Sequence, residues 1–162
     1  MTRLTRRSTS LVAGLLATCA LIAVGAGAVG AKTSSKGKAD SGVAYVSITR
    51  TVKGIEYAAG TNSDKVLGSG AVTYDIALLP GPSGTFKVTS KKVVLYTPTG
   101  SLTGTATATV LVGPKTEKIT NGKLNLTKGA GSQKGHSFVG TFTGSADLVA
   151  NQLVFNYKGT YK

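Results

Sequence analysis

Residues 101–112 read Ser-Leu-Thr-Gly-Thr-Ala-Thr-Ala-Thr-Val-Leu-Val, and this stretch decides the fold. Its even-numbered residues, from Leu102 to Val112, are apolar or glycine, whereas threonine occupies every odd position from 103 to 109. Successive side chains of a β-strand point to opposite faces, so a period of two gives one apolar and one polar face. The stretch therefore predicts a half-buried β-strand with its threonines in water.

The same alternation extends on both sides of this stretch, from Val43 to the C-terminal end. Turn-forming residues separate the alternating segments, and the four prolines, at 80, 82, 98 and 114, lie outside the strand interiors, as a hydrogen-bonded ladder requires. Asn121-Gly122 is a hairpin signal inside the sixth segment, which can therefore also be two short strands. The predicted strands are 43–53, 55–59, 70–79, 85–96, 101–112, 117–128, 136–145 and 151–161.

The fold class follows from the single apolar face that these strands share. Half-buried antiparallel strands in this number must either close into a barrel or pack on a second sheet. Glycines alternate with bulky aromatic residues on the apolar faces near the C-terminal end, as in Phe138-x-Gly140-x-Phe142, and such alternation suits the interior of a small barrel. We expect an all-β antiparallel barrel of about eight strands, with a β-sandwich as the alternative.

The N-terminal segment 1–31 has the features of a secretory signal peptide. Arg3, Arg6 and Arg7 precede an uncharged apolar run over 11–31, which ends in small residues before Lys32. We expect cleavage after Ala31 and a secreted or extracytoplasmic location; an uncleaved N-terminal membrane anchor is the alternative. The polar stretch 32–42 is expected to be a disordered lead-in, and 43–162 to form a single β domain.

Charge and cysteine content limit the partners and the chemistry. Cys19 is the only cysteine, so the chain after residue 31 can form neither a disulfide nor a thiolate metal site, and no cofactor is predicted. Without the three arginines of the signal peptide, the formal net charge falls from +13 to +10. Such a charge favours contact with an anionic wall polymer or membrane surface. Dispersed lysines and a lone arginine, Arg50, argue against specific nucleic-acid binding.

No catalytic residue can be assigned from the sequence. His136, the only histidine, follows a loop of glycine, lysine and serine, where an exposed, inert imidazole is the simpler interpretation. Four carboxylates could act in a pair across a cleft, but none lies in a recognisable motif. Two of them, Glu56 and Asp75, are expected on a solvated strand face. The four are Glu56, Asp75, Glu117 and Asp147.

The candidate ligand-binding residues are those that alternation places inside the barrel. Arg50 shares a strand face with Val46, Ile48 and Val52, so it is expected to point inward and to need an anionic partner. A bulge that turns Arg50 outward is the equal alternative. The other candidates form an aromatic inner face: Tyr74, Phe138, Phe142, Phe155 and Tyr157.

The C-terminal part of the chain, 122–161, resembles a known superfamily. Residues 124–135, Leu-Asn-Leu-Thr-Lys-Gly-Ala-Gly-Ser-Gln-Lys-Gly, resemble the strand and glycine-rich turn of dirigent and allene-oxide-cyclase-like barrels. The resemblance implies an eight-stranded barrel and allows for an apolar cavity and a homo-oligomer. The acidic catalytic residues of those families cannot be mapped onto this sequence, so no active site is carried over from the resemblance. The chain is also similar to small secreted bacterial proteins of unassigned function.

The leading functional hypothesis is an exported, non-enzymatic barrel that binds an apolar or amphipathic small molecule or acts as a cell-surface interaction module. A cyclase-like enzyme that uses the barrel cavity and a purely structural secreted protein are the alternatives. A binder should contain a cavity of several hundred Å³. An enzyme should gather inward polar residues at one mouth, with Arg50 and an acid among them. A structural protein should have a solid interior.

Overall fold

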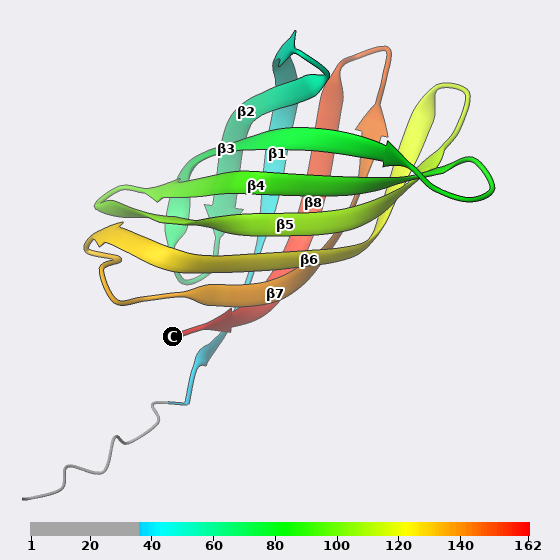
Figure 1. Ribbon diagram of the computed structural model, residues 1–162. Coiled ribbons are helices and arrows are strands. Elements are labelled where there is room, and N and C mark those ends of the chain that lie inside the picture. Colours follow the sequence, from blue (N-terminus) through cyan, green and yellow to red (C-terminus); the bar gives the residue numbers. More distant parts are fainter. Residues whose placement is uncertain (1–35) are drawn as a thin grey trace, which may run out of the picture. The chain divides into compact units, whose positions relative to one another are not determined.

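The computed structural model describes residues 36–162, which form a closed antiparallel barrel of eight strands (Figure 1). The predicted signal peptide and the first residues of the lead-in lie outside the described residues. Within residues 36–162, no helix is long and apolar enough to cross a membrane. The strands are β1 (Lys38–Val52), β2 (Ile55–Asp64), β3 (Gly68–Pro80), β4 (Thr85–Thr97), β5 (Gly100–Val112), β6 (Thr116–Gly131), β7 (Phe138–Asp147) and β8 (Gln152–Tyr161).

Each strand pairs with the next one along the chain, and β1 pairs with β8 to close the barrel. The predicted barrel is therefore confirmed, and the sandwich alternative is wrong. Four hairpin turns, those after β1, β3, β5 and β7, lie at one end, which we call the mouth end. The other three turns lie at the opposite end, together with the start of β1 and the end of β8. We call this the plugged end.

Two predicted boundaries are wrong because strand pairing overrides local composition. The first strand begins at Lys38, inside the stretch 32–42 that was expected to be disordered, since residues 38–42 pair with the last strand. The second strand continues through 60–64, a polar segment that looks like a turn. Those residues pair with β1 on one side and with β3 on the other.

Asn121-Gly122 is a bulge within one long strand and does not form a hairpin turn. The registers of β6 against β5 and against β7 both shift at this point, each leaving one extra residue on β6. Asn121 has a φ of 51°, a left-handed conformation that asparagine tolerates better than most residues. The same backbone preference that makes Asn-Gly a turn signal thus makes it a bulge when both neighbouring strands continue.

The packed core fills the plugged end of the barrel. Leu102, Leu126 and Phe138 are its most buried large side chains, and the Phe138 ring meets the Tyr157 ring edge to face at 5.8 Å. The inward face of 101–112 is the predicted one, since Leu102, Ala108 and Val110 are buried. Ala108 and Val110 belong to a second, smaller cluster toward the mouth end, together with Ile119.

Candidate functional site

A cavity of about 300 Å³ occupies the barrel between the plugged end and the mouth end, and all eight strands contribute to its wall. Its lining is mostly apolar. On β5 the inward residues that line the cavity, Ala106 and Ala108, are small, so they leave space that larger side chains would fill. On the same strand, Leu102 belongs to the packed core. The size of the inward residues therefore sets where the barrel is solid and where it is hollow.

An aromatic cluster lines one side of this cavity. Phe155 packs edge to face against Tyr74, with ring centroids 5.8 Å apart, and against Phe142 at 5.6 Å. Of the predicted ligand-binding residues, Tyr74, Phe142, Phe155 and Tyr157 line the cavity. Phe138 points into the barrel but lies in the packed core and is 1% exposed.

Arg50 lies on the outer surface, so the expectation that it points inward is wrong. The pairing of β1 with β2 shifts register between Ile48 and Arg50, and this bulge reverses the alternation of side chains. Ile48 still lines the cavity, whereas Arg50 is exposed, with its guanidinium carbon 4.5 Å from the ring centroid of Tyr57. The outward alternative is the correct one.

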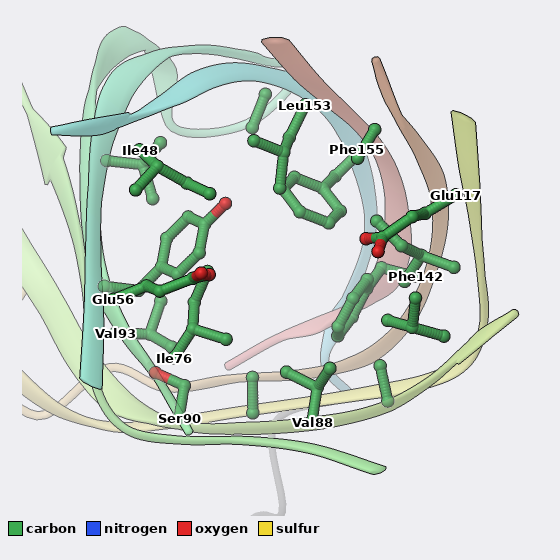
Figure 2. A pocket seen from close by; sticks show the side chains of 18 of the residues that line it. Ile48, Glu56, Ile76, Val88, Ser90, Val93, Glu117, Phe142, Leu153 and Phe155 are labelled. Atoms are coloured by element: carbon green, nitrogen blue, oxygen red, sulfur yellow. The ribbon is translucent and has the colours of Figure 1, made fainter. Parts of the chain in front are cut away.

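Two glutamates point into the cavity from opposite walls (Figure 2). Glu56 was expected on a solvated face, and this is wrong. Glu56 precedes Ala58 by two residues on β2, so both side chains point to the same, inward face, and Ala58 is 3% exposed there. The two-residue turn Lys53-Gly54 sets this register of β2 against β1. Glu117 precedes the buried Ile119 by two residues and shares its inward face. Alternation within 117–128 could have placed Glu117 from the sequence.

The two glutamates interact electrostatically within this apolar space. Burial, and then the negative charge of Glu56, raise the pKa of Glu117. The same two causes hold the pKa of Tyr74 far above its ordinary value, so its hydroxyl stays protonated. The Tyr74 hydroxyl oxygen is buried and has no hydrogen-bond partner. The cavity thus offers two carboxylates and one free hydroxyl among apolar walls.

The other two candidate carboxylates accept hydrogen bonds that stabilise the local backbone. Asp75 accepts hydrogen bonds from the Ser90 hydroxyl and from the Lys92 amide, both at 2.8 Å, and so fixes the bulge in β4. Asp147 lies at the rim of the cavity and accepts from the Val149 and Ala150 amides at 2.9 Å in the turn after β7. These hydrogen bonds give Asp75 and Asp147 a structural role.

His136 lies at the plugged end, away from the cavity. Its ring stacks on Tyr161 with centroids 5.0 Å apart, and its Nδ1 is 3.0 Å from the Lys162 carbonyl oxygen. It is half-buried, not freely exposed as expected. Residues 36–162 contain no group of three His, Cys, Asp or Glu side chains that could hold a metal ion.

The plugged end also contains buried polar residues that were not identified from the sequence. The Tyr157 hydroxyl donates to Asp64 Oδ2 at 2.9 Å, and Asp64 Oδ1 accepts from the Val66 and Leu67 amides. Asp40, 5% exposed, lies beside Asp64, and its Oδ2 has no hydrogen-bond donor. Asp40 and Asp64 lie in the parts of β1 and β2 that extend beyond the strand limits predicted from the sequence.

Comparison with protein families finds no matching family model, and comparisons with curated proteins and with solved structures find no match either. The eight-stranded barrel that the dirigent and allene-oxide-cyclase-like resemblance implied is present. Membership of that superfamily stays a prediction.

Proposed function

We propose that this protein is an exported, non-enzymatic β-barrel that binds an apolar or amphipathic small molecule. The observation that carries the proposal is the apolar cavity of about 300 Å³ toward the mouth end. This volume is at the lower limit of ordinary ligand pockets. At about 30 Å³ for a water-sized group, it holds about ten such groups, enough for an alkyl chain of about eight carbons with a small head group.

The test is binding of a neutral apolar dye, N-phenylnaphthylamine, followed by its fluorescence. Ala108→Phe should fill the cavity and abolish binding, because Ala108 lines it. Thr107→Phe is the matched control, since the exposed Thr107 is the next residue on the same strand and points outward. Far-UV circular dichroism checks that both variants fold. Failure of the wild-type protein to bind the dye, or equal binding by both variants, would contradict the proposal and favour a purely structural protein.

The mouth end supports contact with an anionic membrane surface, the second part of this proposal. Lys53 and Lys115 lie in turns at this end. Exposed apolar side chains beside basic residues are typical of surfaces that enter the lipid headgroup region. Seven large apolar residues at this end are exposed: Val52, Leu78, Leu79, Leu111, Val112, Leu148 and Val149.

Vesicle sedimentation tests the membrane contact. The protein should sediment with vesicles containing phosphatidylglycerol and much less with phosphatidylcholine alone, because each nearby lysine adds about 1 kcal/mol of attraction. Leu148→Ser with Val149→Ser should weaken this binding, whereas Val139→Ser, an exposed valine on β7 near the plugged end, should not. Equal sedimentation of the three proteins would exclude the mouth end as the contact.

A cyclase-like enzyme is the second candidate, favoured by the two carboxylates across the cavity. A carboxyl with a raised pKa that faces a second carboxyl is a possible arrangement of an acid–base pair. If Glu117 transfers a proton, protein with Glu117→Gln purified from the same host should carry a different small molecule from the wild type. Native mass spectrometry of both proteins tests this, and identical bound masses would support a binder.

A further inference from the structure

We propose that the ligand of the cavity is an organic cation, an amine or quaternary ammonium group attached to a short apolar body. This inference rests on the proposed function, since it names the class of molecule that the cavity takes. The cationic group would lie between Glu56 and Glu117, and its apolar body would lie along the aromatic cluster (Figure 2).

The charge distribution supports this choice. Every lysine and arginine in residues 36–162 is exposed, and the cavity lining contains none of them. The charged residues of that lining are Glu56, Glu117 and Asp147. A protein with a large excess of basic residues therefore lines its cavity with acidic side chains and with no basic ones. An ionised carboxylate in an apolar space is costly unless a cation or a proton neutralises it.

The aromatic residues and the free hydroxyl point to the same class of ligand. Phenylalanine and tyrosine rings attract cations to their faces, and they bind quaternary ammonium groups in this way. Tyr74 and Phe155 belong to the aromatic cluster of the cavity. The buried Tyr74 hydroxyl oxygen lacks a partner in the protein and can accept a hydrogen bond from an ammonium N–H.

The same features disfavour the anionic amphiphiles that bind many apolar cavities. A fatty-acid carboxylate would add another acidic group beside Glu56 and Glu117, with no lining lysine or arginine to neutralise it. Like charges at short range in a partly desolvated site repel strongly. The inferred order of affinity for one chain length is therefore cation first, alcohol second and carboxylate last.

The experiment compares octyltrimethylammonium, octanol and octanoate as competitors of N-phenylnaphthylamine. The wild-type protein should bind the ammonium compound at least about tenfold more tightly than the alcohol, and the carboxylate weakest. Glu56→Gln and Glu117→Gln should each weaken the cation about tenfold or more and leave the alcohol unchanged. Thr107→Lys changes the net charge equally on the outer face and should leave this order intact.

A second readout separates direct contact from a general charge effect. Cation binding should strengthen as the pH rises through the titration of Glu117, and it should release protons, since the ligand replaces the proton on that carboxyl. Glu117→Gln should remove both effects. Dye binding with no preference among the three competitors would overturn the inference and leave the apolar-ligand proposal intact. Absence of dye binding itself would overturn both.

Discussion

Replacing Asp40 with asparagine should make the barrel more stable at neutral pH. Burial comes first, and the adjacent Asp64 second, among the causes that raise the pKa of Asp40 from 3.8 to about 6. Asp64 accepts three hydrogen bonds, from Tyr157 and from two backbone amides. Asp40 therefore holds a proton below about pH 6, and its Oδ2, which lacks a donor, is the oxygen that can carry it.

The sign of the pH dependence follows from proton binding. Between pH about 4 and about 6 the folded protein holds more protons on Asp40 than the unfolded chain does, so rising pH lowers the free energy of unfolding. The contribution is complete below the unfolded pKa and is lost above about pH 6. A shift from 3.8 to about 6 corresponds to at most about 3 kcal/mol, and we expect about 1–3 kcal/mol. Tyr157 and Tyr161 also face Asp40, but both remain protonated in this range because their pKa values are raised.

The asparagine of the Asp40→Asn variant would mimic the protonated acid, since its amide oxygen can accept from the Ser41 amide and its NH₂ group can donate to Asp64. The assay is urea unfolding followed by far-UV circular dichroism at pH 4, 5, 6, 7 and 8. Asp40→Asn should match the wild type at pH 4 and exceed it by about 1–3 kcal/mol at pH 8. Thr105→Lys, which makes the same change in charge on the outer face, should show no such dependence. A variant that is less stable at pH 8, or a pH-independent difference, would refute the reasoning.

Five further substitutions test the core, the bulge and the strand spacing by the same unfolding assay. Leu102→Ala should cost about 3–5 kcal/mol, because Leu102 is fully buried, whereas the exposed Leu111→Ala should cost less than about 1 kcal/mol. Asn121→Gly should be nearly neutral and Asn121→Val should cost about 1–3 kcal/mol, because a β-branched residue fits a positive φ poorly. Gly104→Ala should cost at least about 2 kcal/mol, because its Cβ would overlap the Asn125 carbonyl oxygen on β6; a neutral result would contradict the observed strand spacing.

The barrel could be predicted because the alternation that gives each strand one apolar face is recorded locally in the sequence. Each strand from 101–112 onward has one apolar face, and the buried positions such as Leu102, Ala108 and Leu153 fall where a period of two places them. No pattern reports which strand pairs with the first one, so the extension of β1 back to Lys38 was missed. That extension depends on residues 158–161, more than a hundred positions away.

The candidate site was predicted only where alternation continued without interruption. Tyr74, Phe142 and Phe155 follow the period and line the cavity. Arg50 follows a bulge and therefore points outward, whereas Glu56 follows a turn that sets a new register and therefore points inward. A single extra residue in a strand reverses every later side chain, and its position depends on the partner strand.

Because several acidic residues point into the barrel, the formal net charge understates the positive charge of the outer surface. Asp40, Glu56, Asp64 and Glu117 lie inside the barrel, while the basic residues of 36–162 are all exposed. The outer surface therefore carries a positive field stronger than the composition suggests, which suits an anionic wall polymer or membrane. The same field opposes the approach of a cation, but at physiological salt it fades within about 8 Å, whereas the glutamates act at contact distance inside an apolar space. An anionic membrane also concentrates cationic amphiphiles at its surface. A basic exterior and an acidic cavity are thus compatible with the proposed binding of a cationic ligand at such a surface.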